Sequence, residues 1–95
     1  MRITIAACIL LLLSACAGAP VQEMSDARQA IRAAQAAGAA DKAPEVLAHA
    51  QALIDEAQRR LQRHEYREAG NNAIRAREEA VRALEMARAA GSEAR

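Results

Sequence analysis

Apolar residues recur at alternating steps of three and four between residues 21 and 90, the spacing of one face of an α-helix. The first series is Val21, Met24, Ala27, Ile31, Ala34 and Gly38. It predicts a helix over roughly Gln22–Ala37 that stops at Gly38, because glycine is favoured just after a helix end. We expect residues 39–43 to connect to a second helix opened by Pro44, whose missing N–H has no partner in a first turn anyway.

Two further series follow Pro44. The second is Leu47, Ala50, Ile54, Ala57, Leu61 and His64, widened by Val46 and Leu53; the third is Tyr66, Ala69, Ala73, Ala76, Ala80, Ala83 and Ala87. The third series keeps its register through Gly70-Asn71-Asn72, so it predicts one continuous helix across these residues.

The second and third series are out of phase. Continuing the second would place its next member at Glu68, whereas the third begins at Tyr66. A shift of two residues is about 200° around a helix, which favours a chain reversal between about Gln62 and Glu65. That segment has neither Gly nor Pro, so one long helix remains the alternative.

The three series predict an all-α fold, a small antiparallel three-helix bundle over residues 21–90, followed by a polar tail at 91–95. Alanine supplies most of the apolar content, and only about a dozen larger apolar side chains are available to fill a core. Because so small a core is marginal by itself, we expect self-association or a partner.

The amino end has a different pattern. Arg2 gives a positive start, Ile3–Leu13 is apolar, and Ser14-Ala15 are small residues before Cys16. This is the layout of a secretory signal, and the apolar run is shorter than the about 20 residues that span a bilayer. We therefore expect residues 1–15 to be a cleaved signal peptide, which would also remove Cys8.

Leu13-Ser14-Ala15-Cys16 resembles the lipobox of bacterial lipoproteins. The resemblance implies a diacylglycerol thioether on the Cys16 sulfur and an acyl chain, such as palmitate, on its freed amino group. Two or more chains hold a protein stably on a membrane, whereas one does so only marginally. The alternative is an ordinary signal peptide cut near Ala15 or Ala17, with Cys16 as a bystander thiol.

Residues 16–20 then form a lipidated tether. Ala17, rather than aspartate, follows the cysteine; in well-studied Gram-negative lipoproteins this implies transport to the outer membrane. The expected location is therefore the outer membrane, with the protein facing the periplasm.

Charge and composition exclude several partners. The chain has 13 basic and 12 acidic residues, and loss of Arg2 with the signal peptide leaves formal charges that cancel. A neutral module has no electrostatic basis for binding nucleic acid or for broad adhesion to anionic lipid. Tyr66 is the single aromatic residue, so base-stacking platforms are absent as well.

No catalytic or metal constellation is legible. His49 and His64 lack the close ligand spacing of metal sites, and adjacent carboxylates such as Glu78-Glu79 lack the apolar setting that tunes acid-base catalysis. We expect no enzyme activity, cofactor or metal. Tyr66 is the candidate partner contact, because tyrosine offers a large area with a polar tip; alternatively it packs at the hairpin turn with its hydroxyl exposed.

The chain resembles short bacterial envelope lipoproteins that carry domain of unknown function 4398. The resemblance rests on Asp26-Ala27-Arg28-Gln29-Ala30-Ile31 with Ala33-Ala34, Gly38-Ala39, Ala43-Pro44, Leu47 with Ala50, Leu53 and Ala57, and Glu65-Tyr66 with Ala69, Ala73, Ala76 and Ala80. It covers nearly all of the mature chain, implies an α-helical envelope module, and supplies no catalytic residues. The second and third helices also resemble a tetratricopeptide hairpin, although a solenoid needs about three repeats.

These observations predict a lipid-anchored, non-enzymatic periplasmic module that acts as an interaction or structural element of the cell envelope. Its partners would be the membrane, through the lipid on Cys16, and an envelope protein or a second copy. Two alternatives stay open: a binding protein for a small apolar ligand such as a lipid, and an extended self-associating spacer.

Overall fold

The computed structural model describes residues 18–93, which are helical apart from short connections. The helices are α2 (Val21–Ala36), α3 (Ala39–Lys42), α4 (Pro44–Gln62) and α5 (Tyr66–Glu93). No strand occurs within this range, so the predicted all-α class is confirmed. The expected signal peptide and Cys16 lie outside the described residues, as do the last two residues of the chain.

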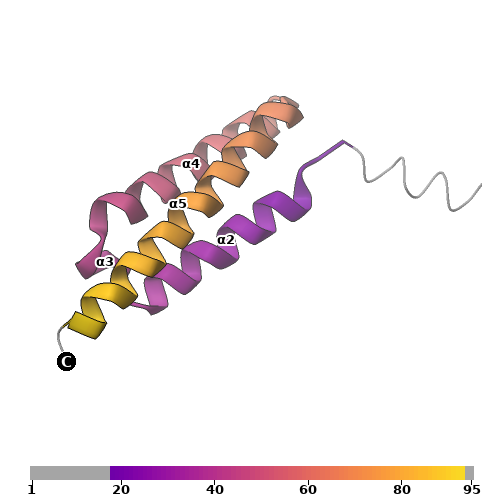
Figure 1. Cartoon of the computed structure of the whole chain (residues 1–95). Coiled ribbons are helices and arrows are strands. Elements are labelled where there is room, and N and C mark those ends of the chain that lie inside the picture. Colours follow the sequence, from indigo (N-terminus) through magenta and orange to yellow (C-terminus); the bar gives the residue numbers. More distant parts are fainter. Residues whose placement is uncertain (1–17, 94–95) are drawn as a thin grey trace, which may run out of the picture.

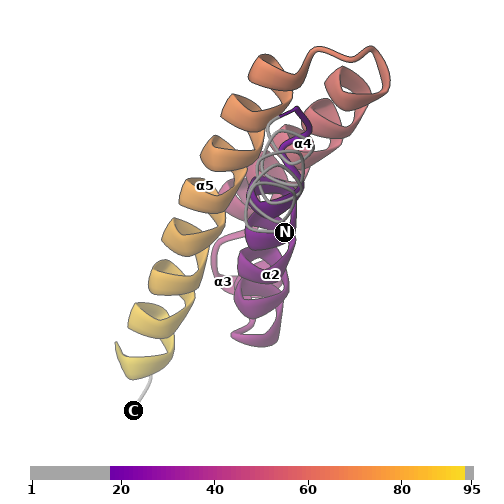
Figure 2. The same ribbon diagram turned by 90° about the vertical axis from the view of Figure 1, so that its right-hand side faces the viewer.

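The three long helices α2, α4 and α5 run alternately up and down, as predicted for an antiparallel bundle (Figure 1). α5 packs against both α2 and α4, which contact each other less. The start of α2 and the α4–α5 turn lie at one end of the bundle, which we call the tether end (Figure 2). α3 and the end of α5 lie at the opposite end, the far end.

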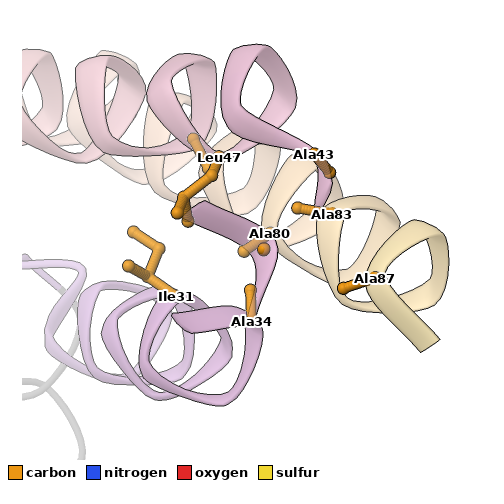
Figure 3. Packing of buried hydrophobic residues seen from close by; sticks show 9 residues of the cluster. Ile31, Ala34, Ala43, Leu47, Ala80, Ala83 and Ala87 are labelled. Carbon is orange, nitrogen blue, oxygen red and sulfur yellow. The ribbon is translucent and has the colours of Figure 1, made fainter. Parts of the chain in front are cut away.

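Alanine forms the whole buried face of α5. Its buried residues are Ala69, Ala73, Ala76, Ala80, Ala83 and Ala87, all with no exposed surface. A methyl side chain lets a neighbouring helix approach closely, so the larger side chains come from the other two helices. Figure 3 shows Ile31 of α2 and Leu47 of α4 pointing toward Ala80. The predicted alanine series is therefore the centre of the core.

The other two series are confirmed with exceptions. α2 buries Met24, Ala27, Ile31 and Ala34, and α4 buries Leu47, Ala50, Leu53 and Ala57. Leu53 replaces Ile54 as the buried residue, because the face of α4 that meets α5 is rotated slightly from the predicted seam. Ile54 is half-buried and packs against both clusters of the core. Val21 was expected in the core but is 72% exposed, since it opens α2 at the tether end.

α2 ends where the sequence predicted. Gly38 has a φ of 86°, in the left-handed region that glycine adopts at little cost. Its N–H donates to the carbonyl of Gln35 at 3.0 Å and so uses one of the carbonyls freed by the helix end. The connection at 39–43 was predicted without regular structure, but most of it forms the short helix α3.

A chain reversal at residues 63–65 separates α4 from α5, so the hairpin is confirmed and the single long helix is wrong. The N–H of His64 donates to Leu61 O at 3.0 Å, and the N–H of Glu65 donates to Arg60 O at 2.9 Å. This pair of bonds defines a Schellman motif, whose left-handed position is usually glycine. His64 takes that position with a φ of 60°. The reversal therefore forms without Gly or Pro.

α5 continues through Gly70-Asn71-Asn72 without a break, as its register predicted. It also continues through Gly91 and Ser92 to Glu93, so the polar tail predicted at 91–95 is helical in its first three residues. The physical reason is tertiary: α5 packs against α3 at the far end. A Cβ on Gly91 would lie 3.1 Å from Nζ of Lys42, which shows how close the two helices are.

Candidate functional site at the tether end

The described chain begins at the tether end with Gly18, Ala19 and Pro20. The N–H of Val21 donates to Ala19 O at 2.9 Å, and that of Met24 donates to Pro20 O at 3.1 Å. Pro20 is buried, whereas Gly18 and Ala19 are exposed. The last residue of the expected tether is thus part of the folded bundle, and the chain before it starts from a fixed position.

Pro20 is held against α5. A Cβ built on Gly70 would lie 3.4 Å from the Cβ of Pro20. Glycine in a helix interior is less favourable than alanine by about 1 kcal/mol, so Gly70 marks a place where another segment comes close. The proximity of these residues, fifty positions apart in the chain, places Pro20 beside α5.

Tyr66, the candidate contact residue, is the first residue of α5 and is 38% exposed. Its ring centroid lies 5.8 Å from that of His64, with the two planes at 54°. A Cβ on Gly18 would lie 3.9 Å from Cδ2 and Cε2 of the same ring. The ring therefore lies between the hairpin turn and the tether, and more than a third of it stays accessible.

An open cleft of about 990 Å³ lies between the tether and the start of α5. Its lining residues are Gly18, Ala19, Pro20, Val21, Gln22, Glu23, Tyr66, Arg67, Gly70, Asn71 and Ile74. Val21 and Ile74 are 72% and 46% exposed, so the cleft offers apolar surface to whatever lies outside the bundle. Its charged side chains are one acid, Glu23, and one base, Arg67.

A charge network stabilises the end of α4 beside this cleft. Glu56 accepts from Arg59 at 2.8 Å and from Arg60 at 2.9 Å, and Arg60 lies 3.5 Å from Glu65 in the hairpin turn. The hydrogen bonds from Arg59 and Arg60 hold the pKa of Glu56 below its usual value, and the bond to Glu56 raises the pKa of Arg60. The network links the last turn of α4 to the residue before Tyr66.

The two histidines occupy different structural positions. His49 Nδ1 lies 3.2 Å from Oε2 of Glu79 and joins α4 to α5, whereas His64 belongs to the turn. Within residues 18–93, no three side chains of His, Cys, Asp or Glu are placed to hold a metal ion. The same part of the chain has no helix with the length and apolarity needed to cross a bilayer.

Tyr66 was named from the sequence as a candidate partner contact, which stays a prediction, and the cleft beside it was not predicted. Val21 was assigned to the core, and the contact between Pro20 and Gly70 was not foreseen. One signal was available, since Gly70 interrupts an alanine-rich helix where alanine would be more favourable. Cys16, the predicted lipidation site, lies two residues before the described part of the chain.

No curated protein and no solved structure matches this chain. A family model described as Domain of unknown function (DUF4398) matches residues 22–95, which contain α3, α4, α5 and all of α2 except Val21. The match covers most of the sequence and agrees with the resemblance carried by the alanine-rich segments of α2, α4 and α5. The chain therefore belongs to the DUF4398 family.

Proposed function

We propose that this protein is a lipid-anchored, non-enzymatic module of the bacterial cell envelope. Cys16 carries the lipid, the anchor lies in the outer membrane, and the helical bundle faces the periplasm as an interaction or structural element. The observation that carries the proposal is the segment Leu13-Ser14-Ala15-Cys16, placed directly before a folded domain.

The fold supports this proposal in two ways. Only Ala17 separates Cys16 from Gly18, the first described residue, so the anchor would lie close to the bundle along the chain. The chain also folds back at residues 63–65, which favours a compact module over an extended spacer. The exposed residues of the cleft, Val21, Tyr66 and Ile74, provide contact surface without reactive groups.

The test compares Cys16→Ser with Cys8→Ser in the full chain expressed in bacterial cells. Both changes remove one thiol, but only Cys16 is placed to become the first residue after cleavage. We expect Cys8→Ser to yield a mature chain whose mass equals that of residues 16–95 plus a diacylglycerol and one acyl chain on Cys16. This chain should be found in outer-membrane fractions. Cys16→Ser should remain an uncleaved, unlipidated precursor.

The measurement is intact mass spectrometry combined with separation of inner and outer membranes. An unmodified wild-type chain, or a Cys16→Ser chain that is processed and located like the wild type, would refute the anchor. A lipidated chain found only in the inner membrane would refute the location and leave the anchor intact.

A further inference from the structure

The tether end must lie close to any membrane that holds Cys16. An extended chain covers at most about 3.6 Å per residue, so Cys16 can be no further than about 7 Å from Gly18. Gly18 in turn lies against the Tyr66 ring, and Pro20 lies against Gly70. The hairpin turn and the start of α5 are thus held beside the anchor. This argument rests on the proposed lipid on Cys16.

The side chains at this end suit the boundary between water and lipid. Tyr66 is amphipathic and partly exposed, and tyrosine is enriched at the headgroup level of membranes. Val21 and Ile74 add exposed apolar surface on either side of the cleft. Exposed apolar groups so close to an anchor gain by leaving water for the acyl boundary.

The basic residues at this end fit the phosphates of the headgroups. Arg59 and Arg60 are engaged with acids, whereas no ion pair within residues 18–93 involves Arg63 or Arg67. Both are exposed, Arg63 at the hairpin turn and Arg67 in the cleft. Glu23 in the cleft and the exposed Glu68 in the first turn of α5 offset these two charges, so the apolar contact carries the docking and each arginine adds only a local contact to a phosphate.

We propose that the tether end rests in the headgroup layer of the bilayer that holds the anchor. Tyr66, Val21 and Ile74 lie at the interface, and Arg63 and Arg67 lie beside lipid phosphates. The three long helices all run between the tether end and the far end, so the bundle points away from the membrane (Figures 1 and 2). The far end, with α3, is then the part presented to the periplasm.

The bundle is long enough to make this orientation measurable. α5 has 28 residues, which at about 1.5 Å per residue extends about 42 Å from the tether end. Tyr66 is also the single aromatic residue of the chain, so its fluorescence reports one position without a label. A matched probe is Tyr66→Phe combined with Ala40→Tyr, because Ala40 is exposed in α3 at the far end.

The experiment uses the full chain expressed in bacteria and purified in its lipidated form. It is reconstituted into vesicles of phosphatidylethanolamine and phosphatidylglycerol, with or without lipids that carry a nitroxide on the headgroup. We expect the nitroxide to quench more than half of the Tyr66 emission and to leave the far-end probe unchanged. Equal quenching of the two probes, or none of either, would overturn the proposed orientation.

Mass spectrometry and vesicle flotation of the same samples separate this outcome from failure of the anchor. A lipidated chain that floats with the vesicles but leaves Tyr66 unquenched refutes the orientation alone. A chain that carries no lipid and does not float refutes the anchor, and the orientation with it. Circular dichroism shows whether the far-end variant retains its helices.

A second pair of variants tests the arginines. Arg67→Gln should reduce the equilibrium constant for docking about fivefold in phosphatidylglycerol vesicles, the effect of one basic residue at an anionic surface, and so should lower the quenching of Tyr66. Arg32→Gln is the control, because Arg32 is exposed in α2 and does not line the cleft. Equal Tyr66 quenching in the two variants would refute the phosphate contact.

Discussion

Pro20 lies beside Gly70, with 3.4 Å between the proline Cβ and the position that a Cβ would take on the glycine. This proximity links the residue before α2 to the second turn of α5. It places the tether, the hairpin turn and Tyr66 at one end of the bundle. The first prediction concerns this pair of residues.

We expect Gly70→Ala to stabilise the protein by up to about 1 kcal/mol, because alanine is the better helix former and the new methyl would meet Pro20 at an ordinary contact distance. Gly70→Leu should destabilise it, since the larger side chain must displace Pro20. Urea unfolding followed by far-UV circular dichroism measures both. Loss of stability in Gly70→Ala would mean that Pro20 packs too closely for a methyl group.

The left-handed residue of the hairpin turn carries the second prediction. A left-handed backbone costs a non-glycine residue about 1–2 kcal/mol, and His64 has a φ of 60°. His64→Gly should therefore raise the free energy of unfolding by about 1 kcal/mol, less what is lost with the ring contact to Tyr66.

Arg63→Gly is the matched control for this change. Arg63 is the neighbouring residue, with a φ of −89°, so glycine relieves no strain there and only adds freedom to the unfolded chain. Denaturant midpoints of the two variants should move in opposite directions. A shift of the same sign in both would argue against stored strain at His64.

The alanine face of α5 gives the third prediction. Ala76 has no exposed surface and lies in the cluster with Met24 and Leu53. Ala76→Leu should destabilise the bundle by about 1–3 kcal/mol, because a close-packed interface has no room for a larger side chain. Ala33→Leu makes the same change at an exposed position of α2 and should have little effect. Similar losses in thermal unfolding would mean that α5 is not the close-packed centre.

The ion pairs of Glu56 make the stability of the protein depend on pH in the acid range. The pKa of Glu56 is lowered by Arg59 and Arg60 from its ordinary value of 4.5, so the folded state favours the ionised carboxylate. Its contribution to stability is complete above the unfolded pKa and is lost as the pH falls below 4.5 through the lowered value. Glu56→Gln should therefore lower the thermal midpoint at neutral pH and make it less sensitive to acid in that range.

Glu78→Gln is the control for acid sensitivity, because no ion pair in residues 18–93 involves Glu78. Its thermal midpoint should follow that of the wild type at each pH. The two glutamine variants can be compared directly, since each replaces one helical carboxylate by a neutral amide of the same shape, half-buried at Glu56 and exposed at Glu78. Identical pH profiles for the two would exclude a specific role for the Glu56 network.

Much of the fold was predictable because its helices are long and strongly periodic. The series from Ala69 to Ala87 identified every buried residue of α5, since one helical face repeats at steps of three and four. Its phase difference from the α4 series also predicted the hairpin. The Schellman motif that reverses the chain was not predictable, because His64 takes the left-handed conformation that sequence rules assign to glycine.

The candidate site was predictable only in part. Tyr66 was identified because it is the single aromatic residue. The cleft beside it forms because Pro20 lies close to Gly70, which is fifty positions later in the sequence. Helical periodicity describes neighbours within one helix and cannot predict such a long-range contact. Val21 was misplaced for the same reason: it fits the α2 stripe, but it lines the open cleft at the tether end and is 72% exposed.

The sequence by itself determined which faces of three helices are buried, where α2 ends and where α4 begins, because helix periodicity and the preferences of Gly38 and Pro44 act locally. Only the tertiary structure decided that Leu53 replaces Ile54 in the core, that α5 continues to Glu93, and that the tether is packed against α5. These features depend on how closely whole helices approach one another. That approach is set by packing between residues far apart in the chain, which no local pattern contains.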